Sequence, residues 1–339
     1  MIFRKLIGLS LAAALVAVSP LASAAPLVKR SMCVFDVVGA NGDMFNMMKD
    51  YKAAAVGWGV DLTIKPYTDE KIAAEDFKAG QCDAIELTGI RARLFNKYTG
   101  TLAAVGAIPD YKTLKLVLQV LSSGNAAINQ HLVTGSNEVA GIVPMGAAYL
   151  FTRDRKVDTV NELSGKKISV MEYDPQEAKM ARMVGMSPVN SDITNFAGRF
   201  NNGSVDLCFA PIAAYSALEL YKGLTPNGGI IDYVLGQLVA EVLIKQDRFP
   251  AGFAQQSRQW MFGQFDRAMQ IIKNAQAEVD PKWWVRIPAD NRANYDEMMR
   301  QSRIKMTKEG LYDPAMTNLL LKIRCKLDPS RAECTNPLE

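Results

Sequence analysis

Short apolar runs separated by polar, helix-prone segments make up the first third of the chain. The apolar runs at 31–38, 61–65 and 82–87 are typical of buried strands, and the segments at 44–56 and 69–79 have helical periodicity. This strand–helix–strand–helix–strand order predicts a parallel, doubly wound sheet. In such sheets ligands lie beyond the carboxyl ends of the strands, so the residues that follow each run are candidates for a binding site.

The same short motif occurs at the end of a helix-like segment in each half of the chain. Phe77 to Asp83 and Phe200 to Asp206 share the skeleton Phe-x-x-Gly-x-x-Asp, and an apolar run follows or overlaps each copy. The Gly can take the left-handed conformation that closes a helix, so each copy predicts a helix that leads into a strand. The repeat predicts two α/β lobes, although a motif this short also arises by chance.

The second half continues with apolar runs and then becomes helical. Small and apolar residues at 138–151, broken by Pro144 and Gly146, suit strands that cross between two lobes. The long apolar run at 234–244 suits a strand that returns to the first lobe. The remaining expected elements are strands at 103–108, 166–170 and 205–210 and helices at 88–98, 111–121, 159–165, 176–184, 192–200, 211–221, 255–279, 290–306 and 313–325.

These elements predict an α/β protein with two lobes, hinge strands between them and long C-terminal helices. We expect lobe I at 27–140, with a returning segment at about 230–250, and lobe II at 141–229. We expect the helical region at 251–339 to pack across the lobes. A chain of 339 residues suits two domains, because it exceeds the size of one ordinary core.

The N-terminus has the pattern of a secretory signal peptide. Arg4 and Lys5 precede an apolar run at 6–18, and an Ala-x-Ala cleavage site ends at Ala24. We therefore expect residues 1–24 to be removed and the mature protein to be periplasmic, a retained membrane anchor being the alternative. A bacterial lipid anchor would need a Cys at the cut, and Cys33 lies well beyond it.

Composition and charge exclude several classes of partner. Hydrophobic residues make up 49% of the chain and charged residues 22%, as in soluble globular proteins. Loss of Arg4 and Lys5 lowers the basic residues from 39 to 37 against 35 acidic ones, which takes the net charge from +4 to +2. So small an excess gives no reason to expect binding to nucleic acid or to an anionic membrane surface.

Five cysteines in an exported protein face an oxidising compartment. We predict a disulfide between Cys325 and Cys334, which would fix the C-terminal tail. A second one between Cys33 and Cys82 follows if their strands are neighbours in the doubly wound sheet. Cys208 is then the odd residue, and its apolar surroundings predict a buried thiol. Spacing alone does not settle the connectivity, so both pairings are hypotheses.

Common catalytic and metal-binding motifs are absent from the sequence. His131 is the only histidine and has no Cys or acidic neighbour at ligand spacing, so a structural or surface role is expected. There is no G-x-S-x-G, H-E-x-x-H or C-x-x-C motif. We therefore expect a binding protein without metal or cofactor rather than an enzyme.

Candidate ligand-binding residues follow the predicted strands of both lobes. Each acidic one is either part of a pocket or an ordinary helix cap or solvated loop residue. If several line one pocket, a cationic or hydroxyl-rich solute is favoured over a dianion, because buried unpaired carboxylates are costly. The candidates are Asp36 and Asn41 after the first strand, Glu86, Thr88 and Arg91 after the third, and Glu172, Tyr173, Pro211 and Tyr215 in lobe II.

Two segments of lobe II resemble a known family. The run Asn-Glu-Leu-Ser-Gly-Lys-Lys-Ile-Ser-Val at 161–170 is similar to the "DLKGxKxRV" segment of periplasmic receptors of tripartite ATP-independent (TRAP, DctP-like) transporters. The Gly203-x-x-Asp206 element and the helices after Pro250 are similar to theirs too. The resemblance points to a divergent branch, some of whose members carry an AdeT-type drug-efflux label. It implies a two-lobed periplasmic-binding-protein-like fold, a small-molecule solute, membrane permease subunits as partners, and a monomer.

The sequence departs from this family where its members bind carboxylates. The family Arg of "KxRV" corresponds to Ser169, and a second family Arg falls on Ala148, next to Tyr149. A Ser hydroxyl cannot replace the bidentate bonding of Arg to a carboxylate, so a dicarboxylate or sialic acid is not implied. Ser169 and Tyr149 complete the candidate set, and Arg91 either compensates for the lost arginines or is a solvated surface charge.

The leading prediction is a periplasmic solute-binding protein that closes around a small organic ligand and delivers it to a TRAP-type permease. One alternative is an accessory protein of a drug-efflux system, which would bind apolar drugs. Another is an extracytoplasmic enzyme that uses carboxylates such as Glu86 or Glu172.

Overall fold

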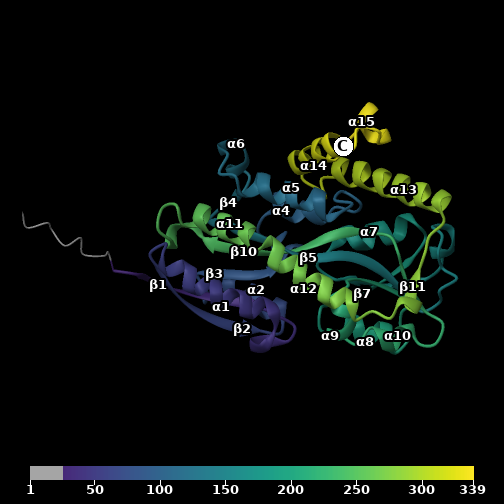
Figure 1. Cartoon of the computed structure of the whole chain (residues 1–339), viewed down its shortest axis with the longest axis horizontal. Coiled ribbons are helices and arrows are strands. Elements are labelled where there is room, and N and C mark those ends of the chain that lie inside the picture. Colours follow the sequence, from purple (N-terminus) through teal and green to yellow (C-terminus); the bar gives the residue numbers. More distant parts are fainter. Residues whose placement is uncertain (1–25) are drawn as a thin grey trace, which may run out of the picture.

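One mixed sheet extends through the molecule and is covered by helices on both faces (Figure 1). The computed structural model describes residues 26–339, so the predicted signal peptide at 1–24 lies outside the described residues. The strand order is β2-β1-β3-β10-β5-β8-β6-β7. These strands are β1 Val28–Phe35, β2 Val60–Tyr67, β3 Ala84–Thr88, β5 Asn137–Thr152, β6 Lys167–Met171, β7 Ser187–Ser191, β8 Leu207–Pro211 and β10 Gly236–Lys245.

The sheet divides into two parallel halves, which are the two lobes. In the first lobe β2, β1 and β3 are parallel, with α1 (Asp43–Val56) and α2 (Glu70–Lys78) beside them. In the second lobe β8, β6 and β7 are parallel, with α7 (Pro175–Met183) and α8 (Phe196–Asn201) beside them. Between the halves β10 and β5 are antiparallel to each other and to their neighbours. The predicted two-lobed α/β fold with hinge strands is confirmed.

The predicted repeat has a structural basis at the start of one strand in each lobe. The Asp83 carboxylate accepts a hydrogen bond from the backbone N–H of Ser31 at 2.8 Å. In the second lobe the Asp206 carboxylate accepts one from the backbone N–H of Lys167, also at 2.8 Å. Each Asp therefore holds the entry of its own strand against the neighbouring parallel strand, and the two copies occupy equivalent places.

The C-terminal helices pack on both lobes. Helices α11 (Phe253–Gly263) and α12 (Phe265–Ala277) lie on β5, and α13 (Ala289–Lys308) contacts α7 of the second lobe. Helix α14 (Pro314–Leu327) packs on α5 (Tyr111–Ser122) of the first lobe, and α13 and α14 lie together at the top of Figure 1. The single helix expected at 255–279 is wrong, because the chain bends at Gly263 and Gln264 and forms two helices.

Several short elements also differ from the predictions. The expected strand at 103–108 is a 3-10 helix, Thr101–Ala103, followed by a turn in which Gly106 has a φ of 63°. The helix expected at 192–200 begins only at Phe196, and β7 before it was missed because its residues are half-buried and mostly polar. The helices expected at 88–98 and 211–221 are each two short helices, α3 Gly89–Ala92 and α4 Lys97–Gly100, and α9 Ala214–Ala217 and α10 Tyr221–Leu224.

The remaining elements are short connections. They are β4 Val133–Thr134, β9 Gly229–Ile231, β11 Trp284–Val285, α6 Ala126–Asn129, α15 Ala332–Thr335, and 3-10 turns at Gly39–Asn41, Asn161–Leu163, Gln246–Arg248 and Pro281–Trp283. Among residues 26–339, no helix combines the length and apolar character needed to cross a membrane.

Both predicted disulfides are present. Cys33 in β1 is bonded to Cys82 just before β3, with a Cα–Cα distance of 5.8 Å. Cys325 in α14 is bonded to Cys334 in α15, with a Cα–Cα distance of 5.5 Å. Cys208 is a buried free thiol, as expected, and burial raises its pKa.

Candidate functional site

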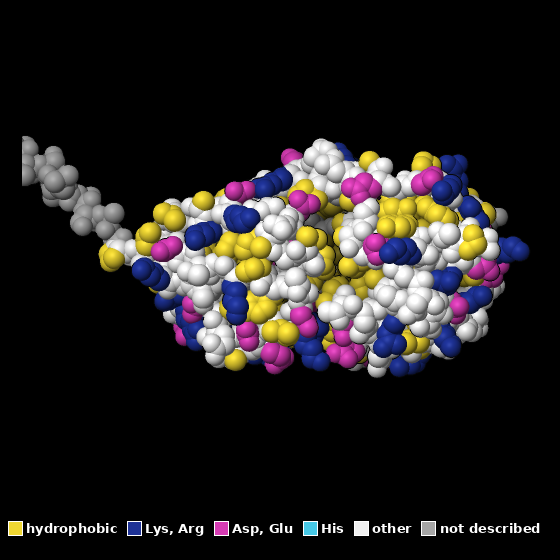
Figure 2. Space-filling model, turned by 90° about the horizontal axis from the view of Figure 1, so that it is seen from below, with side chains coloured by type: hydrophobic (Ala, Val, Ile, Leu, Met, Phe, Trp, Pro, Cys, Tyr) yellow, Lys and Arg dark blue, Asp and Glu magenta, His cyan; other side chains and the backbone are white. Residues whose placement is uncertain are grey.

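Two adjoining cavities lie between the lobes, with volumes of ≈ 180 Å³ and ≈ 140 Å³. They share Phe35 and Val37 from the first lobe, Met145 from β5, and Ala213 and Ala217 from the second lobe. We call them the first and second interlobe cavities. Figure 2 shows a hollow between the two halves of the molecule, with hydrophobic side chains around it. The cleft is therefore built by both lobes and by the strand that joins them.

The walls of these cavities are mainly apolar. Met44 and Met47 of α1 line the first cavity, and Ile90, Phe196 and Phe209 line the second. The methionines thus form a soft wall as well as part of the core. The lining side chains that carry polar groups are Asp36, Asp43 and Glu86 in the first cavity and Thr88, Tyr173 and Glu177 in the second.

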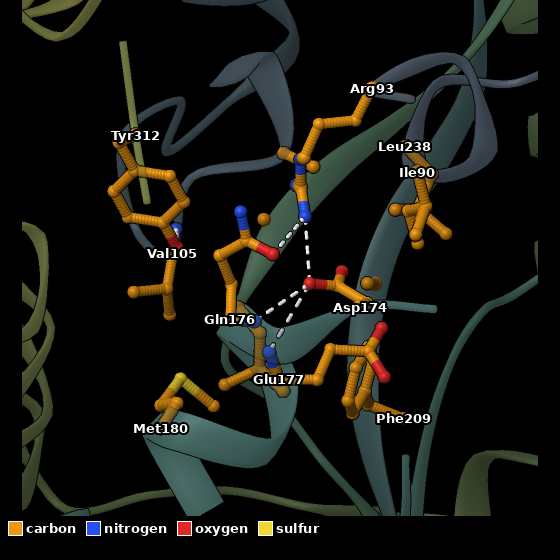
Figure 3. Close-up of a pocket in the computed structure, with 14 residues that line it drawn as sticks. Ile90, Arg93, Val105, Asp174, Gln176, Glu177, Met180, Phe209, Leu238 and Tyr312 are labelled. Atoms are coloured by element: carbon orange, nitrogen blue, oxygen red, sulfur yellow. Dashed lines mark hydrogen bonds and ion pairs between the residues drawn. The ribbon is translucent and has the colours of Figure 1, made fainter. Parts of the chain in front are cut away.

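A third, smaller cavity of ≈ 50 Å³ continues from the second one. Figure 3 shows Arg93 extended toward Asp174 and Gln176, with Glu177 beside Phe209. One Nη of Arg93 donates to Asp174 Oδ1 and to Gln176 Oε1, each at 2.7 Å, while its other donors bond to the carbonyl of Gly100. Since Arg93 belongs to the first lobe and Asp174 to the second, this buried ion pair ties the lobes together.

Five of the predicted site residues line the interlobe cavities. These are Asp36, Glu86, Thr88, Tyr173 and Pro211. Asp36, Thr88, Tyr173 and Pro211 stand at or just beyond the carboxyl end of a strand, which is where the parallel-sheet argument places a site, whereas Glu86 lies within β3. Their role in binding a ligand stays a prediction.

The other predicted residues lie outside the lining of these cavities. Asn41 is exposed, and Glu172 is an exposed partner of Lys71 across the lobes at 3.3 Å. Tyr149 packs its ring against Trp284, and Ser169 is bonded to the Ser191 hydroxyl at 2.6 Å inside the second lobe. The ring of Tyr215 lies beside that of Tyr221.

Asp36 has a structural task in addition to facing the first cavity. Its carboxylate accepts backbone hydrogen bonds from Val38, Met44 and Phe45 at 2.9 to 3.2 Å, so it holds the N-terminus of α1. A Cβ on Gly42 would lie 1.9 Å from Asp36 Oδ1, so any larger residue there would displace this carboxylate. The helix-cap alternative that the sequence left open therefore applies to Asp36.

Glu86 differs from Asp36 because its carboxyl group is incompletely bonded. It is 1% exposed, and its Oε2 has no hydrogen-bond partner among the described residues. Burial, with the nearby charges of Glu70 and Asp36, raises its pKa well above the ordinary value. The protonated form of Glu86 is therefore favoured relative to that of an exposed carboxyl group.

Arg91 belongs to a buried cluster with Tyr173 and Glu70. Its guanidinium stacks on the Tyr173 ring at 3.3 Å, and its Nε lies 3.6 Å from Glu70 Oε2. The Tyr173 hydroxyl donates to the same Glu70 oxygen at 3.1 Å, and the Thr88 amide donates to the other one at 2.7 Å. Burial raises the pKa of Glu70, and the hydrogen bond from Thr88 and the charge of Arg91 partly offset this rise. The cluster joins the lobes and carries no large excess of charge.

Glu177 is the main residue that the sequence reasoning missed. It lies in the first turn of α7, three residues after the N-cap Asp174, in the pattern of a capping box. Instead its Oε2 accepts from the backbone N–H of Met171 at 2.7 Å, and its Oε1 has no partner among the described residues. Burial and the charge of Asp174 raise its pKa well above the ordinary value. No metal-binding group of His, Cys, Asp and Glu occurs within residues 26–339.

The fold is that of TRAP periplasmic solute-binding proteins. One such protein from Desulfovibrio salexigens, solved with bound orotic acid, matches with a TM-score of 0.71 and 13% identity, over 88% of this chain and 98% of the other. The ectoine-binding protein of the TeaABC TRAP transporter of Halomonas elongata matches with a TM-score of 0.70 and 15% identity, over 89% and 99%. Identities this low establish the fold alone.

Sequence comparison is more specific. "Probable solute-binding protein AdeT1" of Acinetobacter baumannii is 46% identical over 301 residues, which are 89% of this chain and 98% of that protein. "Probable solute-binding protein AdeT2" of the same organism is 27% identical over 239 residues, 69% and 98% of the two chains. The model of the family "Solute-binding protein AdeT 1/2" matches residues 53–339. The chain therefore belongs to the AdeT 1/2 family of solute-binding proteins and has the two-lobed TRAP-receptor fold.

Proposed function

We propose that this protein binds a small organic solute between its lobes in the periplasm and delivers it to the subunits of a TRAP-type membrane permease. The observation that carries the proposal is the pair of interlobe cavities, whose walls come from both lobes and from β5. A solute held there contacts both lobes at once, so its binding free energy favours the closed arrangement. A permease can then distinguish loaded from empty protein by its shape.

Contacts across the lobes support this closure. Arg93 pairs with Asp174, Tyr173 bonds to Glu70, and Lys71 pairs with Glu172. We infer that the hinge lies in β5 and β10, with lobe I at 27–140 and a returning segment near 230–250, and with lobe II at 141–229. The receptor acts as a monomer and without catalysis in this proposal.

The test is to look for the solute directly. The protein, purified from its periplasm without denaturation, is analysed by native mass spectrometry, and the refolded protein is screened against solutes by thermal shift. A bound small molecule, or a dose-dependent rise in melting temperature, is expected. If no solute appears in either measurement, and a membrane partner is captured instead, the proposal gives way to an accessory role in efflux.

A further inference from the structure

The two interlobe cavities each contain one incompletely bonded, buried carboxyl group, and the two groups come from different lobes. Glu86 of β3 lines the first cavity and is 1% exposed. Glu177 of α7 lines the second cavity and is 8% exposed. Glu86 Oε2 and Glu177 Oε1 have no hydrogen-bond partner among the described residues. The wall of each cavity therefore includes one buried, incompletely bonded carboxyl group, one from each lobe.

The described residues supply no Lys or Arg to the lining of these two cavities. Arg91 lies behind Tyr173 and is paired with Glu70, although its Nε and one Nη lack hydrogen bonds. Arg93 lines only the third cavity, and its guanidinium is ion-paired with Asp174. The potential inside the interlobe cavities is therefore set by carboxyl groups, with Asp36 and Asp43 adding to the first one.

Building on the proposed function, we propose that the solute is an organic cation with an apolar body, for which Glu86 and Glu177 supply the counter-charges. A buried carboxylate without a partner is costly, and an ammonium group supplies both the missing donors and the opposite charge. The methionine and phenylalanine walls would bury the apolar body. A carboxylate solute would instead meet two acidic groups and find no uncommitted cation in the lining.

Binding of a cation between Glu86 and Glu177 should depend on pH. Burial raises the pKa of both carboxyl groups, with Glu70 and Asp36 adding to the effect on Glu86 and Asp174 adding to that on Glu177. The Phe35 and Met171 amides and Arg93 act in the opposite direction. Binding of a cation favours the ionised forms and so releases protons. Affinity is therefore expected to rise with pH while the ligand stays charged.

Three probes with one phenylethyl body test the charge class: phenethylamine, phenethyl alcohol and hydrocinnamate. Binding to the refolded protein is measured by calorimetry at several pH values. We expect phenethylamine to bind at least about tenfold more tightly than the alcohol, as a charged hydrogen bond would provide, and hydrocinnamate to bind most weakly. The affinity for phenethylamine should also increase with pH.

Isosteric variants locate the effect. Glu86→Gln and Glu177→Gln keep the shape of the protonated carboxyl groups, so the protein should still fold. Each should weaken phenethylamine about tenfold and leave the alcohol unchanged. Glu241→Gln is the matched control, because Glu241 is also fully buried with a free Oε1 but lies outside both cavities. It should change the affinity for neither probe.

Three results would overturn the inference. They are tighter binding of hydrocinnamate than of the amine, equal binding of all three probes, or no loss in either glutamine variant. If none of the probes binds, the inference is tested by the charge of the solute that co-purifies. A cation would support the inference, and a neutral or anionic molecule would refute it. If no solute is found at all, the proposed function itself fails, which is a separate outcome.

Discussion

Replacement of Arg93 by Met should open the lobes. Arg93 makes two hydrogen bonds across the lobes, to Asp174 and Gln176, and the ion-paired side chains are only 10% and 4% exposed. Hydrogen bonds to a charged group contribute about 1.5–3 kcal/mol each. Asp174 keeps its bonds from the Gln176 and Glu177 amides, which reduces the loss. We estimate that the closed form loses about 2–4 kcal/mol of free energy relative to the open form, which shifts the equilibrium about 30- to 900-fold toward the open form.

The assay is a distance measurement between spin labels on the two lobes. Lys52 of α1 and Lys222 of α10 are exposed and can be replaced by Cys for labelling, while Cys208 is buried. Arg93→Met should lengthen the distance and weaken solute binding, with the circular dichroism of the fold retained. The Lys71–Glu172 pair is a control, because it also joins the lobes but is exposed by 61% and 44%. Such pairs contribute about 0–1 kcal/mol. Unchanged distances in Arg93→Met, or equal opening in Lys71→Met, would refute the reasoning.

Three further predictions concern stability. Gly42→Ala should lower the free energy of unfolding by about 1–3 kcal/mol, because the new Cβ displaces Asp36 from the start of α1; unchanged denaturant unfolding would contradict this. Replacing Cys33 and Cys82 by Ser should cost about 4 kcal/mol, against about 3 for Cys325 and Cys334, because they close a longer loop (49 residues against 9); the reverse order would exclude a loop-entropy origin. Burial acts to raise the pKa of Glu333, but Arg324, Arg303 and Arg331 lower it to about 2. The ionised Glu333 therefore stabilises the folded protein above pH 4.5, its unfolded pKa, and this stabilisation is lost as the pH falls toward 2. The melting temperature measured against pH should fall over this range, and the Glu333→Gln variant should lack this part of the pH dependence.

The hydrophobic pattern predicted most of the fold because buried parallel strands and amphipathic helices have distinct periods. The apolar runs located the parallel strands of the first lobe and the hinge strands, and the Phe-x-x-Gly-x-x-Asp repeat located corresponding strands in the two lobes. The pattern failed at 103–108, where apolar residues are buried in a turn rather than in a strand. It also failed at β7, a strand with few apolar residues at its edge position.

The site was only partly predictable for a related reason. Residues within a strand or at its carboxyl end, such as Glu86 in β3 and Pro211 at the end of β8, are placed by the sheet itself, and they line the cleft. Glu177 lies in the first turn of α7, and Arg93 bonds across the lobes from the turn after α3, so neither directly follows a strand. The sequence around Glu177 also matches a capping box, which conceals its free carboxyl oxygen.

The position of Ser169 explains how the cleft can differ in charge from receptors that bind carboxylates. At this point, where the resemblance to TRAP receptors implies an Arg, the hydroxyl of Ser169 bonds to Ser191 inside the second lobe. At the other such point Ala148 lines only the third cavity. No guanidinium therefore enters the interlobe cavities from either place, and the unsatisfied groups that remain there are the carboxyl oxygens of Glu86 and Glu177. Returning an Arg at Ser169 would have to break the bond to Ser191 and place a charge in a site only 4% exposed. Ser169→Arg alone should therefore destabilise the second lobe rather than restore binding of a carboxylate.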